Sequence, residues 1–379
     1  MTVSLVDAAS SVREALKSAT RNLVERESLA ELIVLAAVAC EHMLVIGAPG
    51  TAKSAVVGRV ARALGGTYFE YLLGRFTEPS EIFGPVDLKK LREGRVETET
   101  TGMLPEADVA FLDEVFLGST AILNTLLGIL NERAFRRGHT RIECPLRVCV
   151  GASNDLPEDE SLTAFADRFL VHVFLDPVPD NMLESLLEGG WEVDRSRIQA
   201  LSSLETLDVL TRAAAEARLD AVRTSLAHSI RLLRHAGVHL SDRRLVKSQR
   251  LIAAAAALDG REQPSDGDLW PLLYVIPTRE SQTLAKDVLH EVLSRSTSAT
   301  LTAAAEEASL SVAARAQRLV ERMEGVVQAP PEEPGLREEW HLRFEAWLRE
   351  VDAGFAEDQL PDALRSLRDQ IVNIVRSTQ

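Results

Sequence analysis

The sequence is poor in aromatic residues and in cysteine, and it contains no long apolar run. Aromatic residues make up only 5% of the 379 residues, whereas alanine and leucine are abundant, which favours helices over much of the chain. The three cysteines, Cys40, Cys144 and Cys149, lie in or beside apolar stretches and form no disulfide framework, so we expect buried thiols in a reducing compartment. The apolar run at residues 32–40 is too short to span a bilayer, and no basic segment typical of a secretory signal precedes it. A cytoplasmic protein is expected.

Basic residues are also scarce relative to acidic ones. The chain has 42 Lys and Arg against 57 Asp and Glu, a formal net charge of −15. A broad nucleic-acid footprint requires many cationic side chains to neutralise phosphates, so this balance argues against nucleic acid as the partner. With 46% hydrophobic residues the chain can bury a sizeable core, and its length suggests two or three domains.

Short apolar segments alternate with helical segments in the first half of the chain. After two helices within residues 8–40, strands are expected at residues 43–46, 67–72, 109–112, 146–151 and 169–174. Such alternation indicates an α/β fold, with a parallel sheet covered by helices on both faces. Two excursions interrupt it: a helix or hairpin at 82–104 around Glu93-Gly94, and a hairpin at 133–145 with Arg137-Gly138-His139 at its tip.

After residue 175 the pattern becomes helical. Ser241-Asp242 opens a helix that runs to Gly260, and Ser265 and Asp268 have capping-box spacing for another. Residues 280–324 read as one long helical stretch, residues 328–335 as a proline-rich linker, and residues 336–376 as two helices. The stripe Trp340, Phe344, Trp347 and Leu348 favours packing of these helices into a bundle.

A glycine-rich loop follows the first predicted strand and precedes a helix. Residues 47–54, GAPGTAKS, nearly match the phosphate-binding pattern G-x-x-x-x-G-K-[ST], and the departure is Ala52, where a methyl group crowds a positive φ. We expect the loop to cradle a polyphosphate, with Lys53 on the β and γ phosphates and the Ser54 hydroxyl on Mg²⁺. The predicted ATP-binding residues are Gly47, Pro49, Gly50, Thr51, Ala52, Lys53 and Ser54.

A second motif lies sixty positions after Lys53. The apolar strand 109–112 ends in two adjacent acids, Asp113 and Glu114. Beside a phosphate loop, Asp113 is expected to bind Mg²⁺, and Glu114 to orient and deprotonate the attacking water. The predicted metal ligands are therefore Ser54 and Asp113, and the predicted cofactors are ATP and Mg²⁺.

Several ordered blocks resemble the MoxR-type AAA+ ATPases, and among them the RavA subfamily. The blocks are residues 76–85 (FTEPSEIFGP), 111–115 (FLDEV), 121–127 (AILNTLL), 130–133 (LNER) and 152–157 (ASNDLP). The resemblance covers about residues 10–280, and the phosphate loop of this subfamily also tends to carry alanine at the position of Ala52. It implies that Asn154 is the sensor 1 residue beside Glu114, that Arg168 is an arginine finger acting on the neighbouring subunit, and that Arg243 is sensor 2 in the lid, with Arg244 as the alternative.

The resemblance also implies an assembly and a partner. It implies a homo-oligomer, a hexameric ring, whose insert loops face a pore or a partner, and a partner protein with a von Willebrand factor A domain. RavA-type proteins have a helical stalk interrupted by a compact β-rich domain. Here the linker 328–335 stands in its place, so a partner that docks on that domain is not expected.

The predicted organisation is an AAA+ P-loop core at residues 1–178, a helical lid at 179–278 and a C-terminal helical stalk or bundle at 279–379. The predicted function is an Mg²⁺-dependent ATPase that remodels or matures a complex containing a client protein, with ATP hydrolysed at the subunit interfaces of a chaperone-like ring. Two alternatives stay open: a scaffold whose assembly is gated by ATP binding rather than hydrolysis, and a nucleic-acid motor, which the acidic balance disfavours.

Overall fold

The computed structural model describes residues 3–193, 199–309 and 362–377, and several single residues between them: Val320, Met323, Val327, Trp340, Phe344, Trp347, Leu348, Val351 and Leu360. The predicted linker at 328–335 lies outside the described residues. So does the part of the predicted 280–324 helix at 310–319. Over the described part of the chain, no helix has both the length and the apolar character needed to cross a membrane.

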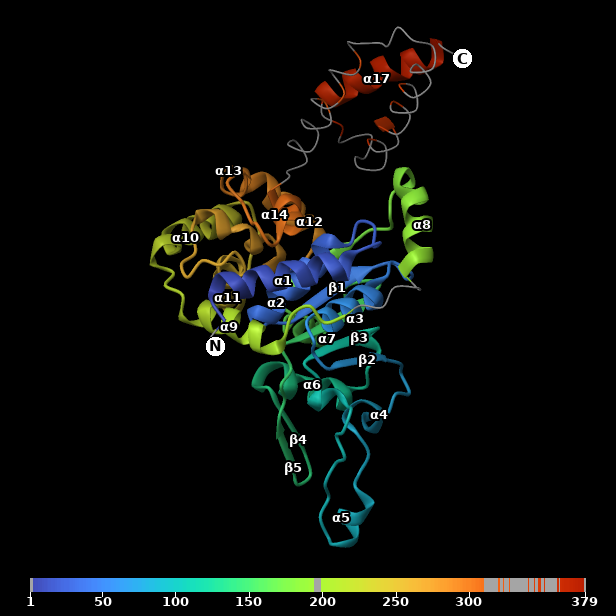
Figure 1. Ribbon diagram of the computed structural model, residues 1–379, viewed down its shortest axis with the longest axis vertical. Helices are drawn as coiled ribbons and strands as arrows, with labels where there is room; N and C mark the ends of the chain where they lie inside the picture. Colours follow the sequence, from blue (N-terminus) through green and yellow to red (C-terminus); the bar gives the residue numbers. More distant parts are fainter. Residues whose placement is uncertain are drawn as a thin grey trace.

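A five-stranded parallel sheet in the order β2-β3-β6-β1-β7 forms the centre of the molecule (Figure 1). Its strands are β1 (Met43–Gly47), β2 (Tyr68–Leu72), β3 (Val109–Asp113), β6 (Val148–Ser153) and β7 (Val171–Leu175). The inner strands β1 and β6 are buried along their whole length, which is typical of a parallel sheet covered on both faces. The prediction of five strands is confirmed, with every end within two residues.

The register of the strands determines which loops meet. In β1, Met43 pairs with Val150 of β6 and Val171 of β7, while β3 pairs with the other side of β6. The loops after β1, β3 and β6 therefore leave the sheet at one edge, which we call the carboxyl edge. The opposite edge is the amino edge. A five-residue strand at about 3.3 Å per residue separates the two edges by roughly 13 Å.

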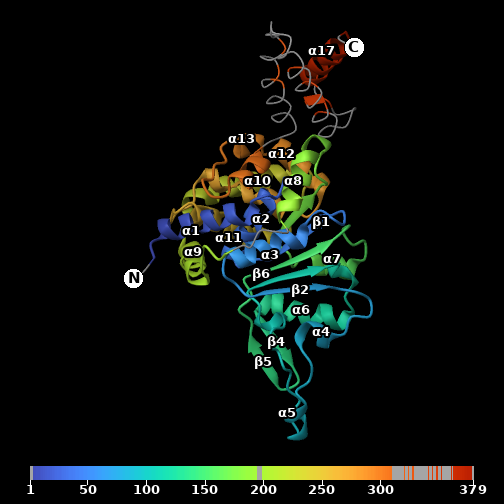
Figure 2. The ribbon, with the colours of Figure 1, turned by 45° about the vertical axis from the view of Figure 1, so that its right-hand side comes forward.

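Helices cover both faces of the sheet (Figures 1 and 2). On one face a single apolar core joins the sheet to the lid helices. Its helices are α1 (Leu5–Thr20), α2 (Glu27–Val38), α3 (Lys53–Ala63), α9 (Leu204–Glu216), α10 (Asp220–His235), α11 (Asp242–Leu258), α12 (Arg279–Val288), α13 (His290–Leu293) and α14 (Thr302–Ser309). A second core on the other face includes residues of α4 (Pro79–Phe83), α6 (Thr120–Glu132) and α7 (Glu160–Ala166).

Two inserts project beyond the helices on the face of α4 and α6 (Figure 2). One carries α5 (Leu88–Arg92) and the other is the antiparallel hairpin β4 (Ala134–Arg137) and β5 (Thr140–Glu143). Two hydrogen bonds connect the inserts: Val96 N–H donates to His139 Nδ1 at 3.1 Å, and His139 N–H donates to Val96 O at 2.8 Å. The structure thus has a hairpin at 133–145 and a helix within 82–104, as the sequence predicted.

The predicted continuous helix from residue 280 is wrong over its described part. Helix α12 ends at Val288 and α14 begins only at Thr302, with the one-turn α13 and an irregular segment between them. The N–H groups of Ala299 and Thr300 in that segment donate to Oδ1 of Asp259, the residue that follows α11. The side chain of Ser298 accepts from Leu301 N–H at 2.9 Å. Short polar side chains of this kind offer the backbone an alternative to helical bonds.

A third apolar cluster lies in the C-terminal segment. It joins α17 (Asp362–Ser377) to the buried side chains of Phe344 and Trp347, and the rings of Trp340 and Phe344 are 4.3 Å apart between centroids. The aromatic stripe of the sequence therefore packs against other helical residues. The predicted domain boundaries at 178 and 278 stay predictions, and the apolar core of the first face runs across both.

The carboxylate of Glu31 in α2 caps the first turn of α14. It accepts from Ala304 N–H at 2.7 Å and from Ala303 N–H at 3.3 Å. These bonds favour the ionised form, but burial outweighs them and raises the pKa of Glu31 to about 7. The proton is therefore held more tightly in the folded chain than in the unfolded one.

Because the folded pKa is raised, the contribution of Glu31 to stability is fully present below pH 4.5 and is lost as the pH rises through 7. We expect Glu31→Gln to gain stability relative to the parent protein between pH 5 and pH 8. Urea unfolding at several pH values measures this difference. Parallel pH profiles of the two proteins would contradict the assignment.

Candidate active site

The loop between β1 and α3 is shaped to bind an anion. Gly50 and Ala52 have φ of 79° and 62°, both in the left-handed region, and Thr51 Oγ1 donates to Ala48 O at 2.9 Å. Helix α3 then begins at Lys53 with no side chain capping its first N–H groups and with no acidic residue in its first turn. Uncapped N–H groups at a helix N-terminus, together with its dipole, favour a phosphate.

Lys53 lies inside this loop. Its ammonium donates to Gly47 O at 2.8 Å and to Ala48 O at 3.0 Å, and the residue is only 7% exposed. Burial lowers the pKa of Lys53, while the nearby carboxylates of Asp113 and Glu114 raise it. The cation is thus held beside the two acids, and the half-buried Ser54 follows it in the first turn of α3. The residues present fit a polyphosphate with Mg²⁺.

The acidic pair lies at the end of β3. Asp113 closes the strand and accepts from Glu114 N–H at 3.1 Å. Glu114 has a φ of 49° and a ψ of 46°, a left-handed conformation that costs a non-glycine residue about 1–2 kcal/mol. Its Oε1 accepts a hydrogen bond from Asn154 Nδ2 at 2.9 Å, just after β6. The structure therefore brings Glu114 and Asn154 together, and strain at Glu114 is typical of a functional position.

Arg26 supports the phosphate loop, a role that the sequence analysis did not predict. It is 4% exposed and donates from Nε to Thr51 O at 2.9 Å and from Nη2 to Asp176 O at 3.1 Å. These bonds tie the phosphate loop to the start of α2 and the end of β7. Burial lowers the pKa of Arg26, and its positive charge also lowers that of Lys53. No motif marks this arginine, because its partners are backbone carbonyls.

A second cation at the carboxyl edge was also missed. Arg279, the first residue of α12, makes two hydrogen bonds of 2.9 Å with the carboxylate of Asp176, which follows β7. Its guanidinium carbon lies 5.4 Å from the ring centroid of Phe174. The pair links the lid to the same edge of the sheet as the phosphate loop.

Arg168 and Arg243 lie at the amino edge instead. Arg168 precedes β7 by three residues, and Arg243 donates from Nη2 to Asn131 Oδ1 at 2.9 Å. Burial lowers the pKa of Arg243, and so does the charge of the nearby Arg168. Within the described chain, Nε of Arg168 and Nη1 of Arg243 are buried and have no hydrogen-bond partner. A strand length separates both residues from the chain's own phosphate loop, so Arg243 is not placed to close the lid over it.

Arg244, the alternative for sensor 2, is part of the core. It is 2% exposed and its guanidinium bonds five groups: Asp167 Oδ1, Phe169 O, Leu170 O, Val275 O and His172 Nε2. Burial and the charge of Arg244 lower the pKa of His172 to about 3, so its neutral ring donates from Nδ1 to Pro277 O and accepts at Nε2. Arg244 thus joins the lid to β7. Of the two arginines, only Arg243 has a guanidinium nitrogen without a hydrogen-bond acceptor in the described structure.

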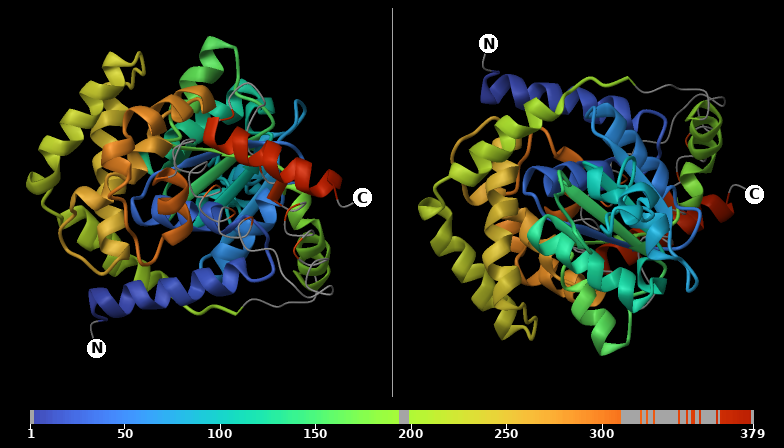
Figure 3. Two further views of the ribbon diagram at one scale, coloured as in Figure 1. Left: turned by 90° about the horizontal axis from the view of Figure 1, so that it is seen from above. Right: turned by 90° about the horizontal axis from the view of Figure 1, so that it is seen from below.

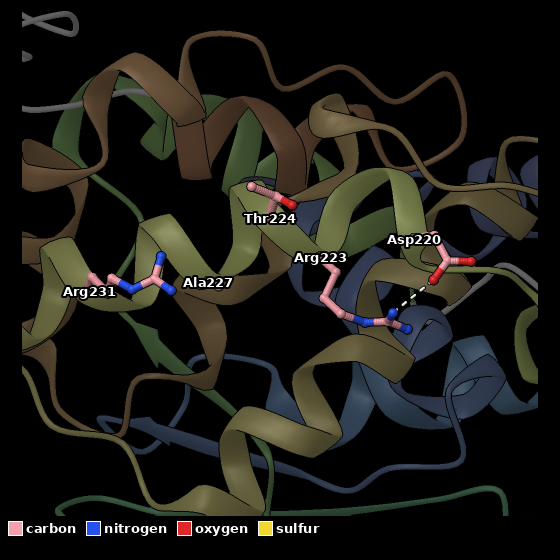
Figure 4. A pocket seen from close by; sticks show the side chains of 5 residues that line it. All are labelled: Asp220, Arg223, Thr224, Ala227 and Arg231. Carbon is pink, nitrogen blue, oxygen red and sulfur yellow. Dashed lines mark hydrogen bonds and ion pairs between the residues drawn. The ribbon is translucent and has the colours of Figure 1, made fainter.

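A surface hollow of about 330 Å³ lies along α10, away from this site (Figure 4). All of its side chains come from that one helix, and Arg223 is already paired with Asp220 at 2.7 Å. A binding site normally gathers polar groups from several elements, so this hollow does not compete with the carboxyl edge.

The parallel sheet, the phosphate loop after β1 and the helical lid define an AAA+ ATPase fold. Residues 10–212 match the family described as the MoxR domain in the MoxR-vWA-beta-propeller ternary systems, and residues 218–287 match the AAA lid domain. The chain belongs to the MoxR family of AAA+ ATPases, a family that binds nucleotides. The resemblance seen in the sequence is confirmed at this level.

Individual relatives agree with this family. The chain is 34% identical over 266 residues to the uncharacterized protein MJ0812 of Methanocaldococcus jannaschii. The matched region covers 70% of each chain. It is 27% identical over 175 residues to the chaperone MoxR1 of Mycobacterium tuberculosis, 45% of this chain and 46% of that one. A crystal structure from Cytophaga hutchinsonii has the same fold, with a TM-score of 0.61 and 16% identity over 78% of this chain and 96% of that one.

The left-handed Ala52 gives a direct test of the loop geometry. We expect Ala52→Gly to retain nucleotide affinity and to stabilise the protein by about 0.5–1 kcal/mol, because relief of roughly 1–2 kcal/mol of strain exceeds the entropic cost of glycine. Urea unfolding and nucleotide titration measure both effects. The control is Ala55→Gly, in the helical first turn of α3, which should lower stability. Equal losses in the two variants would show that Ala52 is not strained.

Proposed function

We propose that this protein hydrolyses ATP, with Mg²⁺, at the interface between neighbouring subunits of a ring. One observation carries the proposal: the chemical groups lie at two opposite edges of the sheet. Lys53 and the Glu114–Asn154 pair are at the carboxyl edge, and Arg168 and Arg243 are at the amino edge. One chain cannot close both groups around a single nucleotide, whereas the carboxyl edge of one copy can face the amino edge of the next.

The carboxyl edge would bind the triphosphate. The N–H groups of the loop and the Lys53 ammonium would donate to its oxygens, and Ser54 and Asp113 would hold Mg²⁺, which neutralises the phosphate charge when bound. Two protein ligands suit Mg²⁺, because it usually keeps waters and phosphate oxygens as its other ligands. The Glu114 carboxylate would take the proton of the attacking water, while Asn154 keeps that carboxylate in place.

The amino edge of the neighbour would supply positive charge. Arg168 and Arg243 each have a buried nitrogen with no acceptor in the described structure, and phosphate oxygens are suitable acceptors. An arginine supplied to a phosphoryl transition state is worth about 10³–10⁵ in turnover. Here Arg243 joins Arg168 as a residue acting on the neighbour's nucleotide.

The ring would use hydrolysis to remodel or mature a protein complex. Membership of a family described from MoxR-vWA-beta-propeller systems supports a partner with a von Willebrand factor A domain, and the relative named a chaperone supports a protein client. The hexameric state, the RavA subfamily and a cytoplasmic location stay predictions. The two surface inserts, which hold each other through Val96 and His139, are the surfaces we expect to meet the partner.

If Arg168 acts on the neighbouring subunit, ATPase activity per subunit must rise with protein concentration. We expect Arg168→Ala to abolish this rise and to lower the saturated rate by about 10³-fold or more. A phosphate-release assay over a range of protein concentrations measures both quantities. The control is Arg223→Ala, which removes an exposed arginine that is paired with Asp220. A parent rate that is independent of concentration would rule out a site shared between subunits.

Glu114→Gln separates an ATPase from a scaffold gated by ATP binding. The amide keeps the shape of the side chain but cannot take a proton, so we expect nucleotide binding to persist while hydrolysis falls at least about 100-fold. The variant should then hold ATP and retain the client in a pull-down. Normal release of the client with no hydrolysis would favour the scaffold.

A further inference from the structure

Helix α8 (Leu183–Val193) carries an exposed apolar stripe beside an acidic one. Four large apolar side chains are 38–75% exposed on this helix: Leu183, Leu186, Leu187 and Trp191. Three exposed carboxylates, spaced four residues apart, each follow one of these apolar residues in the sequence and so form a neighbouring stripe: Glu184, Glu188 and Glu192. The helix contains no basic residue. Apolar groups gathered on an exposed surface and bordered by charge are typical of a protein interaction site.

This helix packs against the connection between α1 and α2, which in turn contacts the phosphate loop through Arg26. It follows β7 at the carboxyl edge, and it approaches the chain before α2 so closely that a Cβ added to Gly189 would lie 2.6 Å from Asn22 O. The same connection holds Arg26, which bonds Thr51 of the loop. The lid helices α10 and α11 lie at the opposite side of the molecule (Figures 1 and 3).

Helix α11 carries the complementary surface. Arg243, Lys247 and Arg250 are spaced by four and three residues, so they share one helix face about 10 Å long. Lys247 and Arg250 bond the single carboxylate of Glu41 at 2.5 and 3.0 Å, which leaves this face with a net positive charge. Arg250 is 62% exposed, and the apolar Val246 beside it is 65% exposed.

The basic face of α11 ends at an apolar hollow of about 320 Å³. It lies between α9, α11 and the end of α2, and its lining includes Cys40, Ala214, Leu219, Gln249, Arg250 and Ala253. The hollow is large enough for one aromatic side chain, and Arg250 places a positive charge at its rim. Cys40 is a partly exposed free thiol.

We propose that α8 of one subunit docks along the basic face of α11 in the next subunit, with Trp191 entering the hollow that Cys40 lines. The acidic stripe of α8, about 12 Å long at 1.5 Å per residue, matches the basic face in length and has the opposite charge. Because the two surfaces lie on opposite sides of the chain, the contact repeats from copy to copy, as a ring requires.

This contact rests on the proposed function and adds a means of assembly to it. Helix α8 packs against the segment that holds Arg26 and through it the phosphate loop, and Arg243 is the first cation on the α11 face. Docking of α8 on that face would therefore bring Arg243 and its neighbour Arg168 towards the nucleotide of the adjacent subunit. The same helix would couple assembly to completion of the active site.

Cross-linking of the full chain tests the contact, because Cys40 is already present. In Trp191→Cys, a short bis-maleimide should join residue 191 of one subunit to Cys40 of the next and give a ladder of covalent oligomers on a denaturing gel. The other two cysteines are buried, Cys144 at 7% and Cys149 at 0% exposure, and should not react. The parent protein should give no ladder.

The control carries both Trp191→Cys and Cys40→Ser and should lose the ladder. Because this control has one reactive thiol per chain, it can give at most a covalent dimer, and a strong dimer band would show that α8 pairs with α8, which overturns the proposal. Absence of a ladder, in a protein whose ATPase activity still rises with concentration, overturns the docking contact but leaves the proposed function intact. If that rise is also absent, the shared active site fails as well.

A second variant keeps the test open if Trp191→Cys does not fold. We expect Leu187→Glu to raise the protein concentration at half-maximal ATPase activity by about tenfold or more, with the saturated rate unchanged. The matched control is Val6→Glu on α1, which places the same charge at a position 65% exposed and should cause no shift. No shift in Leu187→Glu, or the same shift in both variants, would overturn the proposal.

Discussion

The parallel pairing of β6 with both β1 and β3 is the constraint on which the site depends. It sends the loops after all three strands out at one edge, so a lysine, an acidic pair and an asparagine far apart in the sequence become neighbours. The bond from Asn154 to Glu114 is the direct result. The same arrangement leaves Arg168 at the other edge, a strand length away. The sheet thus divides the predicted catalytic groups between two surfaces, and under the proposed function the assembly of subunits brings them together.

Two of the six non-glycine residues with positive φ in the described chain lie where the loops leave this edge. Ala52 and Glu114 are both left-handed although neither is glycine. Each is held by its surroundings: the phosphate loop is tied by Arg26 to the end of β7, and Glu114 is bonded to Asn154. A fold can maintain such conformations only when neighbouring contacts determine them, which explains why buried cations bond backbone carbonyls here.

At the amino edge, several buried polar side chains are paired within the chain. Arg244 uses its donors on β7 and the lid, and neutral His42 donates to Leu130 O and accepts from Cys149 N–H. In the same region four arginines each have one buried nitrogen with no hydrogen-bond partner in the described structure: Arg133, Arg147, Arg168 and Arg243. Under the proposed function, Arg168 and Arg243 find this partner in the nucleotide of the neighbouring subunit, because buried polar groups are usually paired.

The sequence by itself determined the elements whose signal is local: the five strands, the phosphate loop, the acidic strand end and the cap at Ser241 all follow from neighbouring residues. It failed where contacts are remote, at the break before Thr302, which Asp259 stabilises, and at Arg26 and Arg279. It also could not choose between Arg243 and Arg244, because adjacent residues of one helix have the same local signal. Only the tertiary structure shows that Arg244 is buried and bonded within the core while Arg243 has a buried nitrogen with no partner in the described structure. The reason is that burial and the strand-length distance between the two edges depend on how the whole chain packs.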